Sequence, residues 1–168
     1  MADTRRYRFE LTDENGLQDT ISFLVTSEVG TPIETILSDS LFNFAGPNAG
    51  SMVIPGFNAV FQGEPYDIRD QGNNGSDWRS TFALNSTVAG LELRRSTKAA
   101  YDGMATYEDI EAAWAAATVT AGTTDEIFQN DVYIISKAGQ LYAMLASTVI
   151  NTTGDNKDYI VFNVKQQM

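Results

Sequence analysis

The side chains best suited to hold a ligand gather in one short stretch, between residues 66 and 78. In order along the chain they are Tyr66, Asp67, Asp70, Asn73, Asn74, Asp77 and Trp78. Carboxylate and amide oxygens are the ligands that calcium prefers, and aromatic side chains offer a flat apolar surface for a sugar ring. The stretch is therefore the candidate ligand-binding site, for a glycan, a calcium ion or a partner protein.

The spacing of these residues favours a solvated connecting loop over a metal site. Neither this stretch nor a second acidic group, formed by Asp155, Asn156 and Asp158, matches the EF-hand calcium loop with its terminal bidentate glutamate. Aspartate and asparagine are also ordinary residues of turns, where they hydrogen-bond to nearby backbone. We therefore predict no bound metal ion and no cofactor.

Catalytic chemistry is restricted because the chain contains neither histidine nor cysteine. It cannot build a Ser-His-Asp triad, a cysteine nucleophile, a histidine-ligated zinc site or a disulfide. Glycoside hydrolysis needs only two facing carboxylates, but no pair among the 22 acidic residues is singled out by its spacing. We predict that the protein is not an enzyme, and a carboxylate-dependent glycan-active enzyme is the least favoured alternative.

The charge of the chain limits its partners. Its 22 acidic and 11 basic residues give a formal net charge of −11, which repels nucleic-acid phosphates and anionic lipid. No apolar run reaches the length of a membrane span, and the first residues lack the apolar core of a signal peptide. The sequence therefore predicts neither nucleic-acid binding nor membrane insertion. A protein partner or self-association is expected instead, with a glycan as the alternative ligand.

Most elements that would position the candidate site are β-strands. Residues 5–26 alternate between apolar and polar side chains on both sides of Asn15-Gly16, a pair typical of tight hairpin turns, and so predict a half-buried β-hairpin. Residues 131–165 contain three β-rich runs separated by two turns, which predicts an antiparallel meander. The middle, residues 27–100, is rich in loops with short strands, and 33–41 is either a short helix or an extended connector.

One amphipathic helix is expected at residues 106–118, with its regular part near 107–117. Thr106 and Asp109 approximate a capping box, and Tyr107, Ile110 and Trp114 recur at helical spacing along one face. A single helix packed on strands gives a mainly β fold, either a β-sandwich or an antiparallel sheet, with one principal α-helix. At this length we predict that residues 1–168 form a single β-rich domain.

The C-terminal segment carries a resemblance to a known group of proteins. Residues 155–165 resemble the "DNxDYxxFxxK"-like strand that ends many uncharacterised, Bacteroidetes-type cell-surface lipoproteins. Residues 42–51 and 67–70 are similar to two further stretches of that group. The first hairpin looks like the last two strands of an immunoglobulin-like module, which often precedes such an ending. The resemblance implies an exported, envelope-associated β-protein without catalytic residues.

Two functions follow from these observations. The first is a non-enzymatic extracellular or cell-surface module with a binding or structural role, and the second is a structural subunit of a virion or extracellular filament. The first places the protein outside the cell or on its surface, provided that the chain is a processed mature region. Otherwise we expect a virion or cytoplasmic location.

Overall fold

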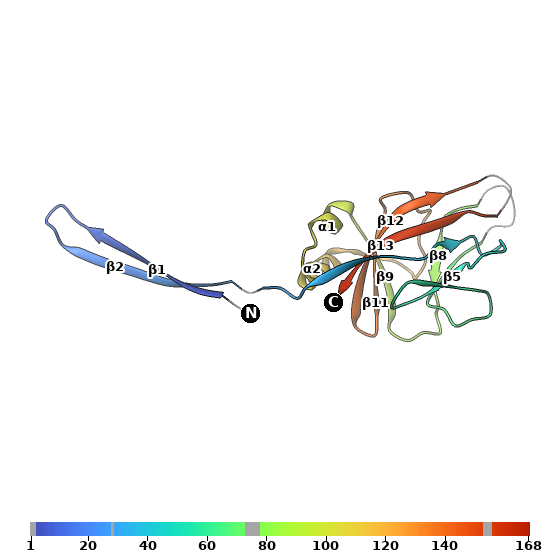
Figure 1. Ribbon diagram of the computed structural model, residues 1–168, viewed down its shortest axis with the longest axis horizontal. Helices are drawn as coiled ribbons and strands as arrows, with labels where there is room; N and C mark the ends of the chain where they lie inside the picture. The colour runs from blue at the N-terminus through green and yellow to red at the C-terminus, as the bar shows by residue number, and fades with distance from the viewer. Residues whose placement is uncertain (1–2, 28, 73–77, 153–155) are drawn as a thin grey trace. The chain divides into compact units, whose positions relative to one another are not determined.

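The computed structural model describes residues 3–27, 29–72, 78–152 and 156–168. The mainly β prediction is confirmed, because the described residues form antiparallel sheets with two helices. The chain divides into two compact units, Met1–Thr31 and Pro32–Met168. The sequence analysis placed the hairpin in one domain with the rest of the chain, whereas in the structure it forms a unit of its own. The second unit is a globular sandwich (Figure 1).

The first unit is a two-stranded antiparallel hairpin of β1 (Asp3–Thr12) and β2 (Gln18–Ser27). Its turn is closed by the Asp13 side chain, whose Oδ1 accepts hydrogen bonds from the backbone N–H groups of Asn15 (2.9 Å) and Leu17 (2.8 Å). Gly16 has a φ of 82°, whereas Asn15 does not take a positive φ. The turn is thus longer than the two-residue type that Asn-Gly suggests, because Asp13 caps it.

The second unit contains two antiparallel sheets. The larger one has the strand order β10 (Thr118–Val119), β9 (Leu91–Ser96), β11 (Val132–Lys137), β12 (Gln140–Ile150), β13 (Tyr159–Gln167) and β3 (Ile33–Leu37), and β4 (Leu41–Phe42) also pairs with β13. The smaller one has the order β6 (Asn58–Val60), β5 (Ser51–Val53), β7 (Ile68–Asp70) and β8 (Phe82–Leu84). Residues 33–41, left open by the sequence, thus contribute strands and no helix.

Two helices lie between β9 and β10 in the chain. Helix α2 (Tyr107–Ala116) confirms the predicted helix, and it begins with Asp109 Oδ2 accepting a hydrogen bond from the Thr106 N–H at 2.8 Å. Helix α1 (Lys98–Gly103) was not predicted. The Thr97 hydroxyl caps it by accepting from the Ala100 N–H at 3.2 Å.

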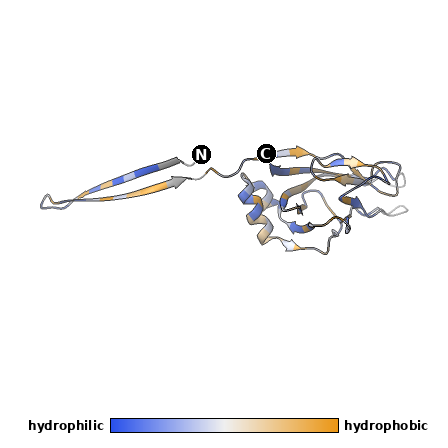
Figure 2. Ribbon diagram, turned by 90° about the horizontal axis from the view of Figure 1, so that it is seen from below, coloured by the Kyte–Doolittle hydropathy of each residue, from blue (hydrophilic) through white to orange (hydrophobic). Residues whose placement is uncertain are grey.

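The centre of the larger sheet, β11 and the first half of β12, is buried on both faces. Alternate residues of β11 point to opposite sides, so that Tyr133 and Ile135 pack in the main core and Ile134 packs in a second core with Ile110 of α2. The main core lies between the two sheets, and the helices cover the other face of the larger one (Figure 1). Burial on both faces explains why the sequence of β11 begins with a continuous apolar run. Figure 2 shows the hydropathy along each strand.

Candidate functional site

Part of the predicted site belongs to the interior of the smaller sheet. Asp67 precedes β7 and Asp70 ends it, and these residues are only 4% and 1% exposed. Trp78 is 2% exposed, and its Nε1 donates a hydrogen bond to Asp70 Oδ1 at 3.1 Å. Tyr66 is half-buried. The remaining predicted residues, Asn73, Asn74 and Asp77, lie outside the described residues, so the ligand-binding role of the whole stretch stays a prediction.

Asp70 is an acceptor for three N–H donors. Its Oδ2 receives hydrogen bonds from the backbone N–H groups of Phe44 (2.9 Å) and Gly72 (2.8 Å), in addition to the Trp78 bond at Oδ1. Burial raises the pKa of Asp70 to about 6, although these three donors act in the opposite direction. The carboxyl group therefore ties residues 44, 72 and 78 together and titrates well above an ordinary aspartate.

Asp67 forms a largely buried ion pair with the larger sheet. Its Oδ2 lies 2.8 Å from Nζ of Lys137, the last residue of β11, and also accepts a hydrogen bond from the Ile54 N–H at 2.6 Å. The Lys137 ammonium group donates in addition to the Ile54 carbonyl oxygen. Each charged group thus has both an ionic and a backbone partner, as buried ion pairs require.

The aromatic ring of Tyr66 contacts the guanidinium of Arg69 and is not an open surface. The Arg69 guanidinium lies 4.2 Å from the centre of the Tyr66 ring and 4.8 Å from that of Phe44, and it donates a hydrogen bond to the Tyr66 hydroxyl. Such cation–π contacts hold an arginine between two aromatic rings. The ring that sequence reasoning offers to a sugar is therefore in contact with a protein side chain.

The two acidic stretches of the sequence meet at residues 43–46. Asn43 Nδ2 donates to Asp158 Oδ2 at 3.2 Å, while the adjacent Phe44 N–H donates to Asp70. A Cβ atom on Gly46 would lie 2.1 Å from the carbonyl oxygen of Asn156, so this crossing requires a glycine. Sequence reasoning missed Asn43, and the glycines of the 42–51 segment were the signal for a close backbone approach.

This polar cluster differs from an open metal site. Among the residues that the structure describes, no three acidic side chains come together as candidate metal ligands. The described carboxylates of Asp67, Asp70 and Asp158 accept hydrogen bonds from protein N–H groups instead. Through these hydrogen bonds the three carboxylates connect loops and sheets of the globular unit.

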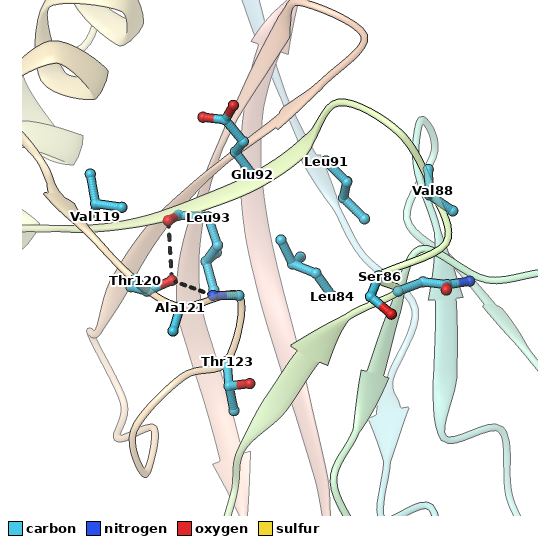
Figure 3. A pocket seen from close by; sticks show the side chains of 12 residues that line it. Leu84, Ser86, Val88, Leu91, Glu92, Leu93, Val119, Thr120, Ala121 and Thr123 are labelled. Carbon is cyan, nitrogen blue, oxygen red and sulfur yellow. Dashed lines mark hydrogen bonds between the residues drawn. The ribbon is translucent and has the colours of Figure 1, made fainter.

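A groove of about 490 Å³ lies elsewhere on the globular unit, between β8, β9 and the segment after β10 (Figure 3). Its walls are mixed, with Leu84, Leu91 and Val119 beside hydroxyl and backbone groups. Thr120 fixes one wall, because its hydroxyl donates to the Leu93 carbonyl oxygen at 3.1 Å and accepts from the Gly122 N–H at 3.3 Å. Glu92 is the charged residue in its lining, and nothing in the sequence marked this place.

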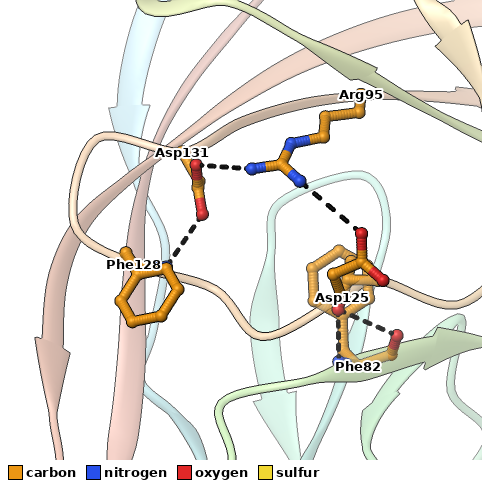
Figure 4. A network of polar contacts seen from close by, with 6 residues as sticks. Phe82, Arg95, Asp125, Phe128 and Asp131 are labelled. Carbon is orange, nitrogen blue, oxygen red and sulfur yellow. Dashed lines mark hydrogen bonds and ion pairs between the residues drawn. The ribbon is translucent and has the colours of Figure 1, made fainter.

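Arg95 of β9 is the centre of a surface charge network (Figure 4). Its guanidinium lies 3.0 Å from Asp131 Oδ1 and 3.6 Å from Asp125 Oδ2, and the second oxygen of Asp131 accepts a hydrogen bond from the Phe128 N–H. The pKa of Arg95 is raised by Tyr133 first and by these two carboxylates in addition. The network fixes the loop before β11.

Comparison of the chain with protein-family models, with curated proteins and with solved structures gives no match. Within the described ranges, no helix has both the length and the apolar character needed to cross a membrane.

Proposed function

We propose that the protein is a non-enzymatic module whose function is contact with other protein chains, made through the N-terminal hairpin. The observation that carries the proposal is a row of apolar side chains on one face of β1 and β2. This apolar face consists of Tyr7, Phe9, Leu11, Ile21, Phe23 and Val25, which are between 45% and 57% exposed. Figure 2 shows β2 as the more hydrophobic of the two strands.

A two-stranded hairpin cannot cover this face by itself. The Phe23 ring lies 5.5 Å from that of Phe9 and 6.1 Å from that of Tyr7, so the aromatic side chains already pack along the face. Their outer surfaces stay in water, and isolated two-stranded hairpins are at best marginally stable there. Contiguous exposed apolar surface of this kind is characteristic of protein–protein contact.

The globular unit fits the role of a scaffold in this proposal. The centre of its larger sheet is covered on both faces, and the carboxylates of Asp67 and Asp70 hold its loops. The absence of histidine and cysteine supports the non-enzymatic part of the proposal, since these are the side chains that most often act as bases and nucleophiles near neutral pH.

Both classes of protein expected from the sequence work by such contact. An extracellular or cell-surface module, the class that the resemblance of residues 155–165 implies, would use the hairpin to attach to a neighbour. A subunit of a virion or filament would use it between copies, and the apolar face favours this second class equally, because repeated assembly needs an exposed adhesive surface.

Site-specific photo-cross-linking tests the proposal. A photoreactive phenylalanine analogue replaces Phe9 on the apolar face, or Leu24 on the opposite face as a matched control, since Leu24 is also well exposed at 61%. We expect adducts to a second protein chain from position 9 and few from position 24, in the purified protein or in cells that produce it. Equal yields from the two positions in both samples would contradict the proposed function.

A further inference from the structure

We propose that Asn15 and Gly16, at the turn of the N-terminal hairpin, form a site of spontaneous covalent modification, at which Asn15 is converted to aspartate and isoaspartate. The proposal does not rest on the proposed function, because the reaction requires only water and the chain itself. Three observations support it: Asn15 is exposed and precedes a glycine, its side-chain amide has no hydrogen-bond partner among the described residues, and Asp13 closes the turn around both residues.

The two reacting groups belong to adjacent residues, so the first step is intramolecular. The backbone nitrogen of Gly16 attacks Cγ of the Asn15 side-chain amide, and the new N–Cγ bond closes a five-membered succinimide ring. The bond from Cγ to the side-chain nitrogen breaks, and that nitrogen leaves as ammonia with the proton that the Gly16 nitrogen loses. Water then opens the ring. Opening at Cγ gives aspartate, and opening at the Asn15 backbone carbonyl gives isoaspartate, so one ammonia is lost and one water is gained.

Gly16 gives the attacking nitrogen open surroundings. Glycine has no side chain to obstruct the approach of its own nitrogen, and a Cβ atom built at this position would meet no other atom within 4 Å. Asn15 and Gly16 are both exposed, so water for the second step reaches the ring. The surroundings of the pair therefore permit both steps of the reaction.

The side chain of Asn15 is free to rotate toward Gly16. Its backbone N–H donates a hydrogen bond to Asp13 Oδ1 at 2.9 Å, but no hydrogen bond connects its side-chain amide to another residue in the described part of the chain. The amide carbon can therefore approach the Gly16 nitrogen without first breaking a side-chain contact.

The other described asparagines lack this combination, since none of them precedes a glycine. Asn43, Asn85 and Asn151 also donate hydrogen bonds from their side-chain amide nitrogens, which fixes those amides in place. Asn58 is exposed like Asn15, but it precedes Ala59, whose backbone N–H donates to a carboxylate oxygen at 2.9 Å. Asn58 is therefore a suitable internal reference for Asn15.

The turn itself limits the rate of the reaction. The Gly16 N–H donates a hydrogen bond to the Asp13 carbonyl oxygen at 3.0 Å, and Asp13 Oδ1 accepts from the N–H groups of Asn15 and Leu17. The Gly16 nitrogen must leave its hydrogen bond before it can turn toward Asn15 Cγ. The reaction therefore proceeds through local opening of the turn, which a two-stranded hairpin allows more readily than a packed core does.

Isoaspartate changes the turn in two ways. It lengthens the backbone by one carbon atom at position 15, and it leaves the α-carboxylate as a charged branch. The added length disturbs the spacing at which Asp13 Oδ1 accepts from residues 15 and 17. The added charge lies beside Asp13 and Glu14 in a turn that is already acidic. We therefore expect the strand ends nearest the turn to separate as the modification accumulates.

The first experiment incubates the full chain in a mildly alkaline buffer and follows each asparagine by peptide mapping and mass spectrometry, in which every conversion adds about one mass unit. Product should accumulate at Asn15 at least about tenfold faster than at Asn58, because only Asn15 precedes a glycine. Asn74-Gly75, the second such pair in the sequence, lies outside the described residues and is followed in its own peptide. Asn15→Gln should abolish conversion at position 15. Equal rates at Asn15 and Asn58 would overturn the proposal.

The second experiment identifies the intermediate and the role of the turn. Hydroxylamine attacks a succinimide and should cleave the wild-type chain after residue 15, whereas Asn15→Gln should resist cleavage there. Asp13→Ala removes the side-chain acceptor of the turn and should speed conversion at Asn15 severalfold while leaving the rate at Asn58 unchanged. Unfolding in guanidinium chloride should give a faster rate still. If neither change affects the rate at Asn15, the turn does not control the reaction, and that part of the proposal is wrong.

Discussion

Asp67 Oδ2 lies 2.8 Å from Nζ of Lys137, and this contact joins residues that are 70 positions apart in the sequence. Asp67 precedes a strand of the smaller sheet, and Lys137 ends a strand of the larger one. The ion pair therefore connects the two layers of the globular unit. It is also largely buried, with side-chain exposures of 5% for Asp67 and 28% for Lys137.

Breaking this pair should destabilise the globular unit. Removing one partner leaves the other charge buried without compensation, which typically costs about 3–5 kcal/mol. Because Lys137 keeps some contact with water, we expect Asp67→Asn to lower the free energy of unfolding by about 3 kcal/mol, the lower end of that range. Urea denaturation measures the change. Asp102→Asn, which breaks the exposed Lys98–Asp102 pair, is the control and should have little effect.

A double-mutant cycle extends the same test. Lys137→Met should destabilise the wild type more than it destabilises the Asp67→Asn variant. In the wild type the replacement leaves the Asp67 carboxylate without its cation, whereas the variant has no carboxylate at this position. Equal effects of Lys137→Met in both backgrounds would mean that the two side chains do not interact.

Asp70 should make stability depend on pH. Its pKa is about 6 in the folded chain and near 3.8 when unfolded, so between these values the folded chain holds a proton that the unfolded chain has released. Stability from this group is therefore greatest at low pH and falls as the pH rises from about 4 to about 6, by roughly 3 kcal/mol. Thermal or urea unfolding at several pH values measures this dependence.

The neutral variant Asp70→Asn isolates that contribution. Its stability relative to the wild type should increase by about 3 kcal/mol between pH 4 and pH 7, because only the wild type ionises a buried group in that window. A difference that does not change with pH would show that Asp70 is ionised over the whole range.

Gly46 should tolerate no side chain. A Cβ atom there would approach the Asn156 carbonyl oxygen to 2.1 Å, and backbone cannot move aside as a flexible side chain can. We expect Gly46→Ala to cost about 1–3 kcal/mol, as overpacking typically does. Gly103→Ala at the end of α1 is the control, since no atom lies within 4 Å of its Cβ position, and it should be neutral or slightly stabilising. Comparable melting temperatures for the two variants would contradict this reading of residues 43–46.

Two buried tyrosines should respond differently to loss of their hydroxyl groups. The Tyr101 hydroxyl donates to the Asn163 carbonyl oxygen at 3.1 Å, so Tyr101→Phe should cost about 1 kcal/mol. The buried Tyr133 hydroxyl has no hydrogen-bond partner among the described residues, so Tyr133→Phe should be neutral or stabilising. Differential scanning calorimetry of both variants makes the comparison, and a larger loss for Tyr133→Phe would reveal a partner for its hydroxyl.

Much of the fold could be predicted because it depends on neighbours in sequence. The hairpin, the meander and α2 are each specified by local signals, such as the Thr106–Asp109 capping interaction at the start of α2. The prediction was less accurate where tertiary packing decides. In β13 the fully buried residues are Ile160, Phe162 and Val164, and Tyr159 and Val161, which alternate with them, are half-buried, because the pairing with β12 and β4 sets which residues face the main core.

The candidate site was harder to predict, because its chemistry depends on distant partners. Aspartates near glycines read as turn residues, but Asp67 finds its cation at Lys137 and Asp70 finds its donor at Phe44. Neither partner is recognisable from spacing in a single sequence. The apolar alternation of β1 and β2 predicted a half-buried hairpin. In the structure these two strands pair only with each other, and no other described element of their unit covers the apolar face.

The strand order also bears on how the chain is made. Glu34 of β3 and Gln166 of β13 are hydrogen-bonded although 132 positions separate them, so the larger sheet cannot be completed on the ribosome until β13 has emerged. The hairpin needs nothing beyond Ser27 and can form first, since synthesis proceeds from the N-terminus. The hairpin of a nascent chain can thus leave the ribosome as a complete unit while the globular unit behind it is still unfolded.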